Sequence, residues 1–212
     1  MGSKSYSFSD EIRNQIEKSI CVKEKIIEKY VDIIDDVTNT IITAYKDGKK
    51  VLWCGNGGSA ADAQHLSCEL VSKFYFDRKA LRSIALTTNS SILTAISNDF
   101  KYEDIFERQV EALADEGDVL VGITTSGTSK NIIKAFKACN EKGVTTVALT
   151  GEFIDKIKDY ADYLIPIPSD TTPHIQESHI MIGHIICYLV EETLFGDKSW
   201  DTERYSSTEM EQ

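Results

Sequence analysis

The stretch "KVLWCGNGGSAADAQHLSCEL", residues 50–70, joins a short apolar run to a glycine-rich loop and then to a helical pattern. An apolar run of this length that stops at glycines indicates a buried strand, and the loop after it turns the chain into a helix. Similar short apolar runs follow at residues 82–87, 118–124, 145–150 and 163–168, with helical patterns between them. Short strands that alternate with helices predict an α/β three-layer sandwich with a five-stranded, mainly parallel sheet covered on both faces.

The N-terminal region carries a different pattern, because no glycine or proline lies between Gly2 and Gly48. Apolar residues recur there at the three-to-four-residue spacing of one helix face, at Ile12, Ile16, Ile20, Ile27, Tyr30, Ile34, Val37 and Ile41. We predict a helical N-terminal extension over residues 1–48, formed by one long helix or by two in series. So long an apolar stripe needs a partner surface, which favours bundle-like packing and oligomerisation.

The last helical pattern begins near Pro173, because proline is favoured in the first turn of a helix. Asp170 and Thr171 are candidate caps for that helix, and Gly196 is its expected end. The residues that follow, 196–212, are expected to form a polar tail.

The composition is that of a globular protein, and 212 residues suffice for one well-buried α/β domain, so we expect a single domain over residues 1–212. A net charge of −11 argues against broad, nonspecific nucleic-acid binding, which relies on a basic surface. No apolar run reaches the roughly 18–20 residues of a membrane-spanning helix, and the N-terminus has no apolar core like that of a secretory signal. The five cysteines form no C-x-x-C pair, which favours reduced thiols in a cytoplasmic protein.

Ligands on parallel sheets bind at the carboxyl ends of the strands, where this sequence concentrates small polar residues. The loop "TTSGTS", residues 124–129, follows an apolar strand and precedes a helical pattern. Its hydroxyls, the free N–H groups of the helix N-terminus and the helix dipole together would make a phosphate cradle. The alternative is a capping loop rich in serine and threonine.

The loop "GNGGS", residues 55–59, has the same placement after the first strand. Gly57 and Gly58 would let the backbone approach a ligand closely, and Ser59 can cap the following helix. The alternative is a tight strand-to-helix turn. The loop matches neither the G-x-x-x-x-G-K-[ST] phosphate loop nor the G-x-G-x-x-G dinucleotide pattern, so ATP and NAD are not indicated.

Two pairs of metal-ligating residue types lie at helical spacing. His65 and Glu69 are four residues apart, and Gln176 and His184 are eight apart, so each pair projects from one helix face. Together they would give a mixed nitrogen and oxygen shell that suits Zn²⁺. The alternative for the first pair is a surface helix pair or a histidine with its hydrogen bonds satisfied, and periodicity alone does not bring the two helices together.

Four motifs resemble those of the phosphoheptose (sedoheptulose-7-phosphate) isomerases, in the same order. They are "CGNGGSAADAQH" with Glu69, "SNDF", "GITTSGTS" and "IQESHIMIGH". That family belongs to the sugar isomerase (SIS) domain superfamily, and the resemblance runs from about residue 10 to residue 195. It implies an SIS, flavodoxin-like fold and a homotetramer.

The resemblance also implies the roles of individual residues. The ligands of one Zn²⁺ per subunit would be His65, Glu69, Gln176 and His184, and Glu69 and His184 would also be the catalytic acid/base pair. The sugar-phosphate site would be lined by Asn56, Gly57, Gly58, Ser59, Glu69, Asn98, Asp99, Thr124, Thr125, Ser126, Ser129 and Gln176. The chain departs from the family's usual residues at three positions, where Thr124 replaces serine and His174 and Lys73 replace arginine.

The implied reaction converts D-sedoheptulose 7-phosphate into D-glycero-D-manno-heptose 7-phosphate for heptose biosynthesis, through an enediol(ate). A carboxylate and a histidine suit this ketose-to-aldose shift, because each can act as acid and base near neutral pH. Two alternatives stay open: an isomerase of another ketose phosphate, and a non-catalytic SIS-fold protein that binds another protein, as the replication-initiator-binding relatives do. The presence of all four metal and acid/base positions favours the enzyme.

Overall fold

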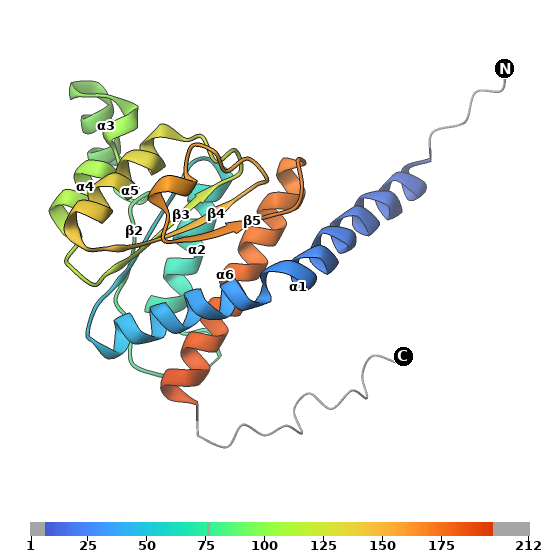
Figure 1. The fold of residues 1–212 in the computed structure, drawn as a ribbon, viewed down its shortest axis with the longest axis horizontal. Helices are drawn as coiled ribbons and strands as arrows, with labels where there is room; N and C mark the ends of the chain where they lie inside the picture. The colour runs from blue at the N-terminus through green and yellow to red at the C-terminus, as the bar shows by residue number, and fades with distance from the viewer. Residues whose placement is uncertain (1–6, 76, 197–212) are drawn as a thin grey trace.

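The computed structural model describes residues 7–75 and 77–196, which form a three-layer α/β sandwich (Figure 1). The strands are β1 (Val51–Gly55), β2 (Ser83–Ala85), β3 (Val119–Thr124), β4 (Thr145–Thr150) and β5 (Tyr163–Pro166). All five pair in parallel in the order β2-β1-β3-β4-β5. The predicted five-stranded parallel sheet is therefore confirmed, although β2 is shorter than its apolar run because it is an edge strand with one partner.

Helices cover both faces of the sheet and enclose a separate apolar core on each side (Figure 1). One face is covered by α1 (Phe8–Lys46), α2 (Gly58–Val71) and α6 (Thr172–Phe195). The other is covered by α3 (Ser90–Asp99), α4 (Glu107–Leu113) and α5 (Lys130–Lys142), with the short 3₁₀ helices η1 (Tyr102–Asp104) and η2 (Lys158–Tyr160) beside them. The central strands β1 and β3 are buried along their whole length, as expected of a parallel sheet covered on both faces.

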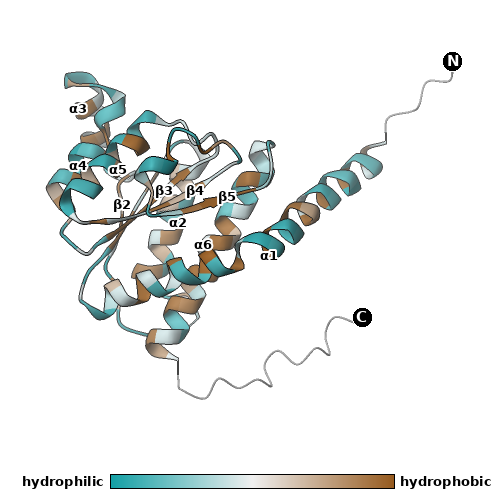
Figure 2. Ribbon diagram, in the orientation of Figure 1, coloured by the Kyte–Doolittle hydropathy of each residue, from teal (hydrophilic) through white to brown (hydrophobic). Residues whose placement is uncertain are grey.

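The N-terminal pattern forms one continuous helix, α1, rather than two in series. Its C-terminal half packs on α6, with Ile34, Val37 and Ile41 buried. Residues 8–18 extend beyond the rest of the described chain with apolar residues along them, including Ile12 (61% exposed) and Ile16 (56% exposed) (Figure 2). A single chain therefore leaves half of the predicted apolar stripe uncovered.

The last helix also follows its sequence signals. The helix α6 has Thr171 as its N-cap residue, proline in its first turn and Gly196 at its C-cap. The predicted polar tail lies outside the described residues beyond Gly196. Within the described ranges, no helix is both long and apolar enough to cross a bilayer.

Candidate active site

The sheet order places the topological switch point between the carboxyl ends of β1 and β3, where a crevice is expected. The chain leaves β1 toward β2 on one side and returns to β3 on the other, and parallel sheets bind ligands at such a switch point. The loop after β1 is "GNGGS" and the loop after β3 is "TTSGTS", so both loops singled out from the sequence lie at this edge.

The turn from β1 into α2 depends on glycine. Gly57 is the N-cap residue of α2 and has a φ of 57°, a left-handed conformation that side chains disfavour. Ser59 lies inside the first turn and is buried, so the prediction that Ser59 caps the helix is wrong. The next residue after the cap, Gly58, makes room for another part of the site, because a Cβ atom there would lie 2.4 Å from Nε2 of Gln176.

The helices α2 and α6 bring His65, Glu69 and His184 into one cluster, with one ligand atom of each residue within 4.8 Å of the others. Nε2 of His65 lies 2.8 Å from Nε2 of His184 and 3.4 Å from Oε1 of Glu69. His65 comes from one helix and His184 from the other, 119 positions later in the chain. The cluster is partly open, since the side chain of His65 is 48% exposed and that of Glu69 is 19% exposed.

The donor set fits a zinc ion. Burial, with a contribution from neighbouring His65, lowers the pKa of His184, whereas Glu69 raises it. The net lowering favours the neutral imidazole, which is the form that binds metals. Zn–N bonds of roughly 2.0–2.1 Å in a tetrahedral site put two ligand nitrogens about 3.4 Å apart, so the 2.8 Å separation of the two imidazoles needs to open only slightly.

The fourth predicted ligand, Gln176, lies near the N-terminus of α6, with its amide against Gly58. The structure therefore places it two helical turns from His65 along α2, at the glycine loop. The neighbouring Ile175 lies near Gly151, where a Cβ atom would be 2.9 Å from Cδ1 of Ile175 and 2.4 Å from the carbonyl oxygen of Thr125. The start of α6 thus connects the glycine loop to the hydroxyl loop.

The hydroxyl loop is organised around buried Thr124. Oγ1 of Thr124 lies 3.1 Å from Oγ of Ser129 and 3.4 Å from Oγ of Ser126. Ser129 is the N-cap residue of α5, yet its side chain makes no capping hydrogen bond. The hydroxyls are therefore drawn together at a helix N-terminus whose first N–H groups point toward the loop, which is the arrangement expected of an anion site.

Two residues that the sequence analysis did not identify hold Asn56 in place. Asn131, buried in the first turn of α5, exchanges two side-chain hydrogen bonds with Asn56, of 3.0 and 2.8 Å. The hydroxyl of Tyr102 donates a third to Oδ1 of Asn56 at 2.8 Å. Since these bonds saturate Oδ1, Asn56 can offer a ligand its remaining side-chain N–H or its backbone.

Asn98 and Asp99 lie apart from the groups described so far. Both are exposed at the C-terminal end of α3, and Nδ2 of Asn98 donates to Oδ1 of Asp99 at 2.8 Å. In the described part of the chain no hydrogen bond connects either residue to the metal cluster or to the hydroxyl loop. Their region is connected to the site through the 3₁₀ turn that follows, where Tyr102 bonds to Asn56 and Glu103 pairs with Lys130 at the start of α5.

Comparisons with known proteins show the family and the fold of the chain. The SIS domain family matches residues 16–151. A phosphoheptose isomerase of Clostridium acetobutylicum is 56% identical over 189 residues, 88% of this chain and 96% of that protein. One from Aneurinibacillus thermoaerophilus is 54% identical over 90% of this chain and 97% of its own length. The solved phosphoheptose isomerase of Neisseria gonorrhoeae superposes with a TM-score of 0.83 at 37% identity, covering 88% of this chain and all of that one.

Proposed function

The chain belongs to the phosphoheptose isomerases of the SIS domain family and is an isomerase, and we propose that it converts D-sedoheptulose 7-phosphate into D-glycero-D-manno-heptose 7-phosphate. The observation that carries this proposal is the cluster of His65, Glu69 and His184 between α2 and α6, the two helices whose first turns meet at the glycine loop. A sugar phosphate needs both parts: an anion site for its phosphate and acid/base groups for its carbonyl end.

In this proposal the phosphate binds at the N-terminus of α5, between the hydroxyls of Ser126 and Ser129 and the backbone at the start of the helix. Residues Asn56, Gly57, Gly58, Ser59, Thr124, Thr125 and Gln176 would line the rest of the sugar, and Asn98 and Asp99 would reach it from α3. Binding energy from the phosphate, which does not react, holds the C1–C2 end against Glu69 and His184.

The chemistry removes a proton from C1 and adds one at C2, and protons also move between the two oxygens. Glu69 and His184 are the proposed acid/base pair, because they approach each other from two different helices, α2 and α6. Nε2 of His184 faces His65 and Glu69, so Nδ1 is the nitrogen left for proton transfer. His65, Glu69 and His184 would hold one zinc ion per subunit, and Gln176 would be the fourth ligand after its amide turns from Gly58 toward the cluster. The ion would polarise the substrate carbonyl when bound.

The substrate assignment is tested by comparing ketose phosphates of five, six and seven carbons with the purified, zinc-loaded protein. The expected result is the highest kcat/KM for sedoheptulose 7-phosphate. A higher kcat/KM for a shorter ketose phosphate would make that sugar phosphate the substrate instead of the heptulose phosphate. The assignment of the protein as an isomerase would stand. Binding to another protein with no turnover of any ketose phosphate would favour the non-catalytic alternative.

Replacing Ser126 or Ser129 by alanine is expected to raise KM about tenfold, with kcat changed little. A hydrogen bond to a charged group contributes roughly 1.5–3 kcal/mol, and the phosphate charge is the same in the ground state and the transition state. Steady-state kinetics measure both constants. Thr43→Ala is the control, since it removes a hydroxyl that bonds within α1. A large fall in kcat at unchanged KM would contradict the phosphate assignment.

The chain is proposed to form one SIS domain over residues 1–212, in the cytoplasm, as a homotetramer. The exposed apolar half of α1 supports the oligomer, because contiguous exposed apolar surface marks interaction sites. Light scattering is expected to give about four times the mass of one chain. Ile12→Glu with Ile16→Glu should dissociate the oligomer, whereas Glu17→Gln on the polar face should not. A stable monomer at micromolar concentration would refute the proposal.

A further inference from the structure

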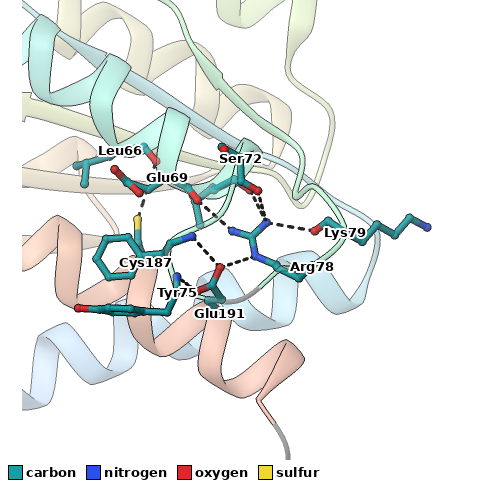
Figure 3. Close-up of polar contacts among 10 residues, drawn as sticks. Leu66, Glu69, Ser72, Tyr75, Arg78, Lys79, Cys187 and Glu191 are labelled. Carbon is teal, nitrogen blue, oxygen red and sulfur yellow. Dashed lines mark hydrogen bonds and ion pairs between the residues drawn. The ribbon is translucent and has the colours of Figure 1, made fainter.

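A buried ion pair connects the two helices that carry the metal cluster. Arg78, in the segment between α2 and β2, donates from Nε to Oε1 of Glu191 at 2.7 Å (Figure 3). The two side chains are 2% and 0% exposed. Glu191 lies on α6, seven residues and so about two helical turns beyond His184. The pair therefore lies next to the cluster along the same helix.

The guanidinium of Arg78 also binds the C-terminal end of α2. Its Nη2 donates to the carbonyl oxygen of Glu69 at 3.0 Å, and its Nη1 donates to that of Leu70 at 2.8 Å (Figure 3). The last carbonyls of a helix lack partners within the helix and carry the negative end of its dipole, so a cation there is stabilising. Arg78 thus fixes the backbone of Glu69 itself, a proposed ligand and acid/base residue.

The carboxylate of Glu191 holds the chain that leaves α2. It accepts hydrogen bonds from the backbone N–H of Phe74, at 2.9 Å, and from that of Tyr75 (Figure 3). The ring of Phe74 lies against the imidazole of His184, with 5.7 Å between the ring centroids. Glu191 therefore controls a side chain that limits the orientation of His184.

The helices have little freedom to compensate for a change in this pair. A Cβ atom at Gly183 would lie 2.4 Å from Cδ1 of Leu66, so the backbone of α6 is already in close contact with α2 beside the cluster. Burying two charges is costly, and a well-packed apolar pair can stabilise a fold as well or better. Stability alone therefore gives no reason for a buried ion pair here. The fixed hydrogen-bond geometry of the Arg78 guanidinium gives one, because it holds the end of α2 in a set position.

We propose that Arg78 and Glu191 are positioning residues that set the geometry of Glu69 and His184 for the metal and for proton transfer. This inference rests on the proposed function, in which those two side chains bind zinc and move protons. Arg78 connects to the cluster through the Glu69 carbonyl, and Glu191 connects to it through Phe74. Both side chains are buried and so face the protein interior.

The test compares the zinc affinity and the kinetics of conservative variants. Arg78→Lys keeps a positive charge but loses the planar fork that reaches Glu191 and two carbonyls together. Glu191→Gln keeps the size of the side chain and removes its charge. Both are expected to weaken zinc binding by about 10–100-fold, the usual effect of losing an outer-shell partner, measured by competition with a chromophoric chelator. Both should lower kcat while KM stays within about twofold.

The chain offers a matched control in a second buried ion pair. Lys50 and Asp118 have side chains that are 6% and 1% exposed, and they lie at the amino ends of β1 and β3. In the described part of the chain their side chains bond to each other and to Asp115, and these bonds reach neither the metal cluster nor the Arg78–Glu191 pair. Lys50→Arg and Asp118→Asn should lower the melting temperature as much as the test variants do, with zinc affinity and kcat unchanged.

Each outcome decides one proposal. Folded Arg78→Lys and Glu191→Gln proteins that bind zinc as tightly as the unmodified protein would overturn the positioning role, whatever their melting temperatures. Equal losses of zinc affinity in the control variants would also overturn it, because the effect would then follow general stability. If the unmodified protein binds zinc but isomerises no ketose phosphate, the proposed function fails, while the zinc affinities still decide the role of the pair.

Discussion

Glu69→Gln is expected to lower kcat by about 10²–10⁴-fold, the usual contribution of a general acid/base group. The amide keeps the size of the side chain but can no longer take up a proton. Binding of sedoheptulose 7-phosphate should survive better than turnover, because the hydroxyl loop and the start of α5 are untouched. Steady-state kinetics give both constants, and zinc content must be measured on the same samples.

The control for this change is Glu177→Gln. Glu177 lies on α6 beside Gln176, but its carboxylate contacts Ser19 of α1 rather than the metal cluster. The control should isomerise at nearly the unmodified rate. A Glu69→Gln protein that retains its metal and turns over normally would remove Glu69 from the acid/base pair.

His65→Ala is expected to reduce zinc affinity by more than about 100-fold, beyond the usual effect of losing only an outer-shell partner. His65 is the residue that faces both of the other donors, with its Nε2 2.8 Å from His184 and 3.4 Å from Glu69. Without it, only two members of the described cluster and the neutral amide of Gln176 are left. Isomerase activity should fall in parallel with metal content.

Elemental analysis of protein purified without chelators measures this loss directly. Gln64→Ala is the matched control, because Gln64 is the exposed neighbour of His65 on α2. It should retain full zinc content. If His65→Ala binds as much zinc as the control, His65 is not a ligand.

Much of the fold follows from local patterns in the sequence. The apolar runs at residues 50–55 and 118–124 became buried central strands because each is short, continuous and followed by a loop of small polar residues. The long α1 helix follows from its uninterrupted stripe. The cap of α2 was mispredicted because the positive φ of Gly57 allows a sharper turn into the helix than a serine cap at Ser59 would give.

The site is less accessible to sequence reasoning because its contacts are non-local. Helical spacing pairs His65 with Glu69, but only the packing of α2 against α6 brings in His184, 119 residues away. The partners of Asn56 and Glu191 lie 75 and 113 residues away in the sequence. A single buried asparagine or arginine has no periodicity, so Asn131 and Arg78 leave no signal of their roles before the chain is folded.

The most direct test of the proposed function is ¹H NMR of sedoheptulose 7-phosphate incubated with the zinc-loaded protein. We expect the anomeric proton signals of an aldose heptose 7-phosphate to appear and to reach equilibrium with the ketose. A reaction that starts from the purified aldose should reach the same equilibrium mixture of aldose and ketose. If the zinc-loaded, folded protein produces no aldose signals from this ketose, the proposed heptose-phosphate isomerase is contradicted.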